Sequence, residues 1–206
     1  MRIGIIGSGN IGGTCATLLA GAGHEVAVAN RRGPDSIADQ VAGLGPGARA
    51  ATVDDAAAFG EVVIVAIPLR AYRDLPAAAL AGRIVVDAMN YYAERDGRLP
   101  ELDTGATTSS EMVAEHLAGA RVVKAFNTIW YQRLLTEGRP AGDPKRLALP
   151  IAGDDAEAKA AVTGLIDEMG FDAVDAGPLA AGARQQPGAP VYNAPLTAEE
   201  VRAALA

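Results

Sequence analysis

The stretch Ile3-Gly4-Ile5-Ile6-Gly7-Ser8-Gly9-Asn10-Ile11-Gly12 decides the fold of this chain. Its apolar start predicts a short buried strand, and Gly7, Gly9 and Gly12 form the pattern G-x-G-x-x-G directly after it. A helical stretch follows over 14–19, and a second apolar run begins at Glu25 after a glycine turn. Strand, glycine loop, helix and strand in this order predict a βαβ unit that binds a dinucleotide.

Each glycine of this loop has a physical task. Gly7 permits the tight turn, Gly9 lets the backbone approach a pyrophosphate, and Gly12 lets the helix pack closely on the strand. The unpaired N–H groups and the dipole of the helix N-terminus then favour the phosphates. The alternative is a glycine-rich turn that binds nothing, and the complete strand–loop–helix context argues against it.

The end of the second strand favours NADP over NAD. In folds that prefer NAD, an Asp or Glu at this position accepts hydrogen bonds from the adenosine ribose. Here Asn30 takes that place and Arg31 and Arg32 follow it, so no carboxylate repels a 2′-phosphate and a guanidinium can pair with it. Ser36, near the next helix start, can add a hydroxyl or a backbone N–H. The alternative is that both arginines are ordinary solvated side chains.

The alternation of strand and helix continues along the rest of the chain. The apolar runs are nearly continuous rather than alternating, as expected of parallel strands covered on both faces. They occupy 3–6, 25–29, 50–53, 61–67, 83–87, 121–125, 147–151 and 172–174. We expect one α/β domain of the Rossmann type, a doubly wound parallel sheet over residues 1–206, with the core in 1–178 and a C-terminal extension in 179–206.

Local signals place several helices and loops between these runs. Thr108 and Glu111 have the spacing of a capping box, and Asp154-Asp155 opens a helix that Gly170 closes. The polar segments 91–107 and 133–145 contain Gly and Pro and predict surface loops, and a last short helix is expected over 197–205.

Composition narrows the class of protein. The net charge of −7 argues against a nucleic-acid partner, which would need a basic patch. Cys15 is the single cysteine and there are two histidines, so we expect no disulfide and no metal site. The chain starts directly with a strand, without a signal-peptide pattern, and no apolar stretch approaches membrane-spanning length. These features predict a cytoplasmic protein without a membrane partner.

Several strings together resemble a known family. With the glycine loop and Asn30-Arg31-Arg32, they are 123–129 (V-K-A-F-N-T-I), 151–155 (I-A-G-D-D) and 175–179 (D-A-G-P-L). The chain resembles the NADPH-dependent F420 reductases over almost its whole length, and it is similar to the NADPH oxidoreductase domain of the STEAP metalloreductases. The resemblance implies hydride transfer between NADPH and a small-molecule acceptor, coenzyme F420 or a flavin (FMN or FAD), and it allows a homodimer paired through C-terminal elements.

The resemblance also implies where the cofactor and the acceptor lie. Ser8, Asn10 and Ile11 would belong to the pyrophosphate loop, with Asn30, Arg31 and Arg32 at the 2′-phosphate. The positions implied near the nicotinamide and its ribose are Ile67, Pro68, Leu69, Asn90, Asn127, Thr128 and Ile129. No acid or base residue is required, because the cofactor performs the chemistry and the protein orients it.

Some residues keep two interpretations. Asn127, where archaeal F420 reductases resembling this chain carry a histidine, either holds the nicotinamide carboxamide or the acceptor ring or caps the next helix. Pro178 either shapes the acceptor pocket or forms an ordinary turn after a strand. Trp130 and Tyr131 could wall the site, although core burial is favoured. His24, His116 and Cys15 are expected to have structural roles.

Two other classes compete with the reductase hypothesis. A non-catalytic NADP(H) sensor would use the same loop, and its mark would be a pocket too closed for an acceptor. A pyrroline-5-carboxylate reductase or β-hydroxyacid dehydrogenase would place its substrate against a large C-terminal helical domain, for which little sequence follows Pro178.

Overall fold

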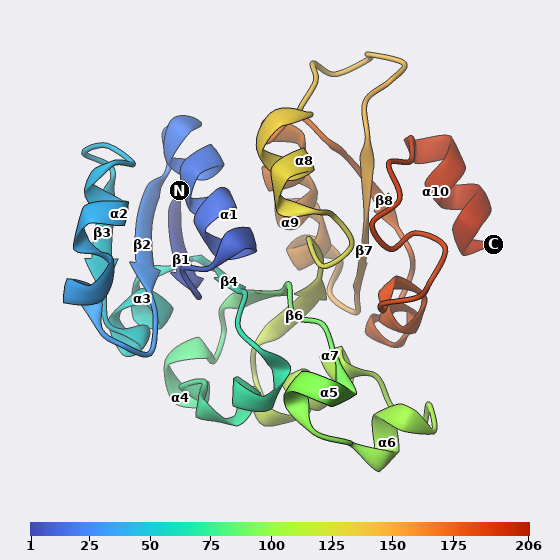
Figure 1. Cartoon of the computed structure of the whole chain (residues 1–206), viewed down its shortest axis with the longest axis horizontal. Helices are drawn as coiled ribbons and strands as arrows, with labels where there is room; N and C mark the ends of the chain where they lie inside the picture. The colour runs from blue at the N-terminus through green and yellow to red at the C-terminus, as the bar shows by residue number, and fades with distance from the viewer.

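The computed structural model describes residues 1–206 as one eight-stranded sheet with helices on both faces. The strand order is β3-β2-β1-β4-β5-β6-β7-β8, and Figure 1 shows β3, β2 and β1 on the left and β7 and β8 on the right. The strands are β1 (Arg2–Ile6), β2 (Glu25–Ala29), β3 (Ala48–Ala51), β4 (Val62–Val65), β5 (Ile84–Asp87), β6 (Arg121–Lys124), β7 (Ala148–Gly153) and β8 (Asp172–Asp175). The Rossmann-type α/β fold expected from the sequence is confirmed.

The helices divide between the two faces of the sheet. One face carries α1 (Asn10–Gly21), α2 (Ala38–Ala42), α8 (Tyr131–Thr136) and α9 (Ala156–Glu168). The other carries α3 (Val53–Phe59), α4 (Ala77–Leu80) and α7 (Ser109–His116). The remaining elements are η1 (Pro34–Ile37), η2 (Leu69–Asp74), α5 (Ala93–Asp96), α6 (Pro100–Asp103), η3 (Leu179–Gln185) and α10 (Ala198–Leu205).

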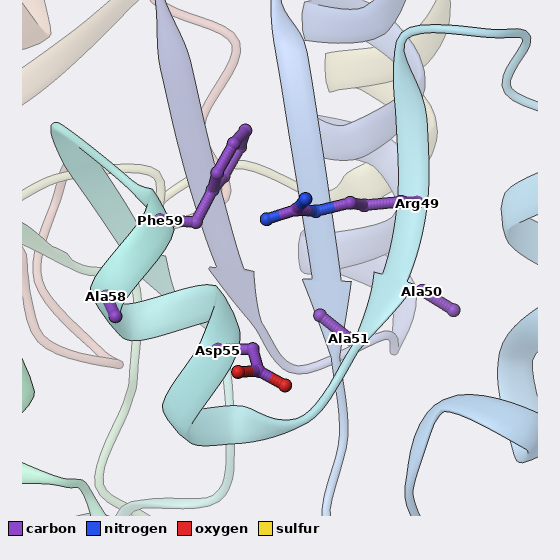
Figure 2. Close-up of a pocket in the computed structure, with 6 residues that line it drawn as sticks. All are labelled: Arg49, Ala50, Ala51, Asp55, Ala58 and Phe59. Carbon is purple, nitrogen blue, oxygen red and sulfur yellow. The ribbon is translucent and has the colours of Figure 1, made fainter.

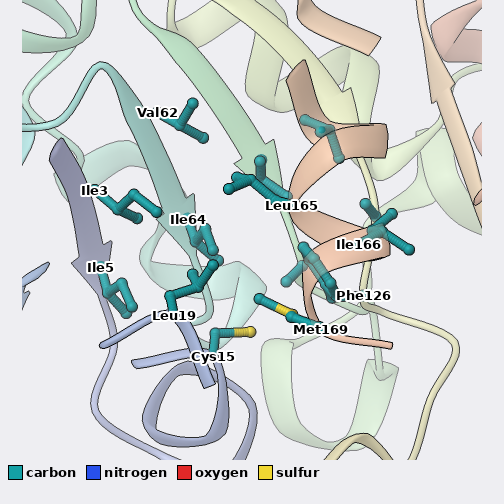
Figure 3. Packing of buried hydrophobic residues seen from close by; sticks show 14 of the residues in the cluster. Ile3, Ile5, Cys15, Leu19, Val62, Ile64, Phe126, Leu165, Ile166 and Met169 are labelled. Carbon is teal, nitrogen blue, oxygen red and sulfur yellow. The ribbon is translucent and has the colours of Figure 1, made fainter. Parts of the chain in front are cut away.

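Buried aliphatic side chains of the strands form a core on each side of the sheet. Successive residues of a strand point to opposite faces, so Ile3 and Ile5 join the core under α1 while Ile6 joins the core under α3 and α7. Figure 3 shows Ile5, Leu19 and Cys15 packed together between β1 and α1. Cys15 has no exposed surface, which confirms its expected structural place.

The direction of two strands differs from the expectation. The first six strands are parallel, whereas β7 pairs with β6 in antiparallel register. The helix α9 connects β7 to β8, which runs parallel to β7. Continuous apolar character indicates that a strand is covered on both faces and carries no information about its direction, so the sequence could not show this reversal.

The segment 91–107 also differs, because it holds the short helices α5 and α6 where a loop was expected. The capping box of α7 is present as expected, with reciprocal hydrogen bonds between Thr108 and Glu111. Asp155 caps α9 as expected, by accepting a hydrogen bond from the Ala158 N–H.

The C-terminal extension packs on the two reversed strands. Side chains of α10, including Val201 and Leu205, form a small core with β7 and β8. No helix combines the length and the apolar character needed to cross a membrane. The chain nowhere gathers three or more His, Cys, Asp or Glu side chains in a group suited to a metal ion.

Candidate functional site

A cleft of about 380 Å³ opens at the carboxyl ends of the central strands. It lies where the strand order reverses between β1 and β4, the place at which open α/β sheets bind their ligands. Predicted site residues from four strand ends meet on its lining: Asn10, Ile11, Ile67, Pro68, Asn90, Asn127 and Ile129.

The glycine loop has the geometry that a pyrophosphate loop needs. Gly7 has a φ of +116°, and a Cβ added there would lie 2.3 Å from the Ala66 carbonyl oxygen. A Cβ at Gly12 would lie 1.8 Å from the Gly7 carbonyl oxygen, so α1 can approach β1 only through glycine. A Cβ at Gly9 would meet nothing within 4 Å, which leaves open space in front of the α1 N-terminus.

Asn30 organises the loop after β2. Its amide nitrogen donates to the Ser8 hydroxyl at 3.1 Å, and its Oδ1 accepts from the Arg32 N–H at 2.8 Å and the Ser36 hydroxyl at 3.1 Å. The side chains of Arg31 and Arg32 are exposed and make no hydrogen bond or ion pair within the protein. Two free guanidinium groups therefore flank the end of β2.

Asn127 is held in the wall of the cleft with one atom unpaired. The preceding Phe126 has a φ of 61°, a conformation that non-glycine residues rarely adopt. The Asn127 amide nitrogen donates to the Gln185 carbonyl at 2.6 Å and to Asn90 Oδ1 at 3.0 Å, and Asn90 donates back to the Asn127 carbonyl at 2.9 Å. Asn127 Oδ1 is buried and has no partner.

The helix-cap interpretation of Asn127 is wrong, because α8 begins only at Tyr131 and Trp130 is its N-cap. The amide therefore belongs to the cleft. This leaves an unpaired acceptor beside Asn90, where an amide N–H of a ligand would satisfy it.

Three of the residues predicted near the nicotinamide or the acceptor do not line the cleft. Leu69 is completely buried at the start of η2, and Pro178 is exposed before η3. Thr128 is buried, and its carbonyl accepts the Asn193 N–H at 2.7 Å, which fastens the C-terminal tail to the end of β6. Leu69 and Thr128 are thus buried residues of the interior, and Pro178 is not part of the cleft lining.

The aromatic side chains of Tyr92, Trp130, Tyr131 and Tyr192 line the cleft and form its mouth. Of these, Trp130 and Tyr131 were considered as walls of the site from the sequence. Trp130 is 49% exposed, so its expected core burial is wrong, and its ring meets Tyr131 edge to face at 6.0 Å. The Tyr92 hydroxyl bonds to the Tyr192 hydroxyl from the C-terminal tail. Tyr92 and Tyr192 are 100 residues apart, so no local pattern could have joined them.

A buried ion pair lies under the floor of the cleft. Lys124 and Asp87, neighbours on β6 and β5, are fully buried with 3.3 Å between Nζ and Oδ2. Lys124 also donates to the Met89 carbonyl at 3.1 Å, and the Ser110 hydroxyl donates to Asp87 at 2.6 Å. Because removal of one partner would leave a buried charge unpaired, this network fixes the ends of both strands.

The two histidines lie elsewhere, as expected. His24 bonds to Glu168, and His116 meets Tyr72 edge to face and bonds to the Leu75 carbonyl. Neither lines the cleft.

A second hollow, of about 470 Å³, lies between α3 and the edge strand β3 (Figure 2). There Arg49 of β3 and Phe59 of α3 point toward each other, with the guanidinium carbon 4.1 Å from the ring centre. It shares no residue with the cleft, and four of its six lining residues are hydrophobic. The smaller cleft is the candidate functional site, because polar groups from several strand ends converge there.

Comparisons with known proteins show which family the chain belongs to. Residues 2–91 match the family described as NADP oxidoreductase, coenzyme F420-dependent. A hypothetical protein of Sinorhizobium meliloti is 34% identical with a TM-score of 0.81, over 96% of this chain and 95% of that one. A putative F420-dependent NADP reductase of an Arthrobacter species is 30% identical with a TM-score of 0.75, over 89% and 87%.

A curated relative is longer. The metalloreductase STEAP3 of Rattus norvegicus is 36% identical over 182 residues, which are 87% of this chain. The match spans 34% of the metalloreductase, about a third of its length.

Proposed function

Because the chain belongs to the family of coenzyme F420-dependent NADP oxidoreductases, we propose that it transfers hydride between NADPH and a flavin-like acceptor, coenzyme F420 or a flavin. The observation that carries the proposal is the cleft, onto which the glycine loop, the Asn127 amide and the aromatic mouth all open. Its volume of about 380 Å³ falls within the usual range of small-molecule sites, roughly 300–1,000 Å³.

The residues present fit NADP(H). The open space at Gly9, in front of a helix N-terminus, suits a pyrophosphate, and the free side chains of Arg31 and Arg32 suit a 2′-phosphate. At the other end, the unpaired Asn127 Oδ1 suits the N–H of a carboxamide. These three places follow β2, β1 and β6, and the sheet holds these strands in that order. The same order, 2′-phosphate, pyrophosphate and nicotinamide, is that of the parts of NADP(H).

Bound NADPH supplies the hydride, and the side chains of the cleft position it and exclude water. Ile67, Pro68 and Ile129 provide apolar walls, whereas Asn90 and Asn127 hold one another and leave one acceptor for the ligand. The lining contains no carboxylate, histidine or thiol, which agrees with a reaction that needs no side-chain acid or base.

The sensor hypothesis is less well supported. It called for a pocket too closed for an acceptor, whereas the half-exposed indole of Trp130 lies at an open mouth. Exposed aromatic surface next to a ligand cleft favours a second ligand that covers it.

The test is reduction of an acceptor by the purified protein. NADPH with oxidised coenzyme F420 should bleach the F420 absorbance, and NADH with F420 and NADPH with FMN or FAD are measured in parallel. Turnover of F420 makes the protein an F420 reductase, and turnover of flavins alone makes it a flavin reductase. NADPH binding without reduction of any acceptor would contradict the proposal and favour a sensor.

A further inference from the structure

Arg95 is the one charged residue on the lining of the cleft. The protein as a whole carries a net charge of −7, yet no acidic side chain faces this space. A lone guanidinium in such a lining attracts anionic groups and disfavours cations.

The Arg95 guanidinium is fixed from one side. Its Nε and Nη2 donate to the two carboxylate oxygens of Asp96 at 3.0 and 2.8 Å, and Nη2 also donates to the Asn90 carbonyl at 2.6 Å. Its Nη1 makes no hydrogen bond or ion pair within the protein. The side chain is therefore oriented in advance and keeps one donor group free.

Asp96 does not cancel this preference. Its side chain is fully buried and also accepts the N–H groups of Tyr92 at 3.0 Å and Arg70 at 3.3 Å. The Arg70 side chain donates to the Arg95 carbonyl at 2.7 Å, which adds a second cation to the group. The single carboxylate is thus used to hold α5 in place.

Aromatic rings stand beside the free donor. The Arg95 guanidinium carbon lies 4.9 Å from the centre of the Tyr92 ring, whose hydroxyl bonds to Tyr192, and Trp130 lines the same cleft. Flat faces next to a fixed cation suit a ligand that combines a conjugated ring with an anionic tail.

We propose that Arg95 selects acceptors that carry an anionic tail, which it binds through its free Nη1 while their ring lies against the aromatic mouth. This inference rests on the proposed function, because only that function makes the second ligand an electron acceptor. The competing source of an anion is the pyrophosphate of NADP(H) itself, so the test must separate the two.

Binding is measured by fluorescence, because Trp130 is the only tryptophan of the chain and lies at the mouth. The protein is saturated with NADP⁺, which prevents turnover, and titrated with FMN or with riboflavin, which has the same ring without the phosphate. Coenzyme F420 and its deazaflavin core without the tail form a second pair. The wild type should bind the tailed member of a pair about tenfold more tightly, the usual worth of a charge-assisted hydrogen bond.

Arg95→Gln should bring this ratio close to one, with little change for the tail-less ligand or for NADP⁺. Arg98→Gln is the matched control, since Arg98 is 82% exposed, bonds to Asp103 and does not line the cleft. It should keep the wild-type ratio. If Arg95→Gln does not fold, Arg95→Lys is used instead. It keeps a cation for Asp96 but lacks the planar, forked set of donors of a guanidinium, and it should lose most of the preference for the tailed ligand.

Three results would overturn the inference. The first is a wild type that shows no preference for the tailed member of either pair. The second is an equal loss for both members in Arg95→Gln, which would mean that the arginine only supports the wall. The third is an equal loss for NADP⁺, which would assign Arg95 to the cofactor. Selective binding without turnover would keep the inference and contradict only the proposed reaction.

Discussion

Arg31 lies in the loop after β2, and its side chain has no partner in the protein. If it meets the 2′-phosphate, Arg31→Ala should weaken NADPH binding by about 1.5–3 kcal/mol and leave NADH nearly unchanged, because only NADPH carries that phosphate. Titration calorimetry with both cofactors measures this. Arg202→Ala, on the exposed side of α10, removes the same charge far from the loop and should change neither. Equal losses for NADPH and NADH in Arg31→Ala would contradict the assignment.

Single residues of the candidate site could be predicted where a local sequence motif contains them. The family resemblance implied Asn10, Ile67, Asn90 and Asn127, which line the cleft together because parallel strands end at one edge of a sheet. Arg95 and Tyr192 had no such signal, because α5 and the C-terminal tail meet only in the folded molecule. Their positions depend on tertiary contacts, such as the hydroxyl pair that joins Tyr92 to Tyr192.

Among the elements, α1 and α9 offer a matched pair of glycines. Gly12→Ala should disrupt the contact of α1 with the loop and abolish NADPH binding, because the new Cβ would lie 1.8 Å from the Gly7 carbonyl. Gly164→Ala in α9 meets nothing within 4 Å and should stabilise the protein by roughly 0.4–1 kcal/mol, because it restricts the unfolded chain. Urea unfolding and an NADPH titration of both variants check this. A Gly12→Ala protein with normal affinity would refute the tight packing.

Helices and strands could be predicted where residues close in sequence determine them. The capping box fixed the start of α7 because both of its hydrogen bonds form between near neighbours in sequence. The four-residue helices α5 and α6 were missed because each is a single turn, whose existence depends on contacts such as the buried Asp96 carboxylate. The reversal of β7 was missed because burial and direction are independent properties of a strand.

At the scale of the whole molecule, the local charge at the candidate ligand sites is opposite in sign to the net charge of the protein. The chain is acidic, with a net charge of −7, whereas its candidate ligand-facing cations lie in the loop after β2 and on the cleft. Arg31 and Arg32 flank the end of β2, and Arg95 stands at the mouth of the cleft. Local positive groups on an acidic protein attract small anionic ligands without creating the broad basic surface that binds nucleic acid.

The stability of the whole molecule should fall at alkaline pH because of one buried thiol. Burial raises the pKa of the Cys15 thiol well above its ordinary value, to about 12. Below about pH 9 the thiol is protonated in both the folded and the unfolded chain, so its contribution does not change. Above that pH the unfolded chain ionises and the folded one does not, so the free energy of unfolding should decrease by up to about 1.4 kcal/mol per pH unit until about pH 12.

Urea unfolding of the wild type and Cys15→Ala between about pH 7 and pH 11 isolates this contribution. Cys15→Ala is expected to be less stable at neutral pH, because it removes a completely buried side chain, but its stability should begin to fall only near pH 10. The later decline comes from tyrosine, since burial and the bond to Tyr92 raise the pKa of Tyr192 to about 12. Parallel curves for the two proteins would mean that Cys15 ionises in the folded chain, and hence that α1 opens without global unfolding.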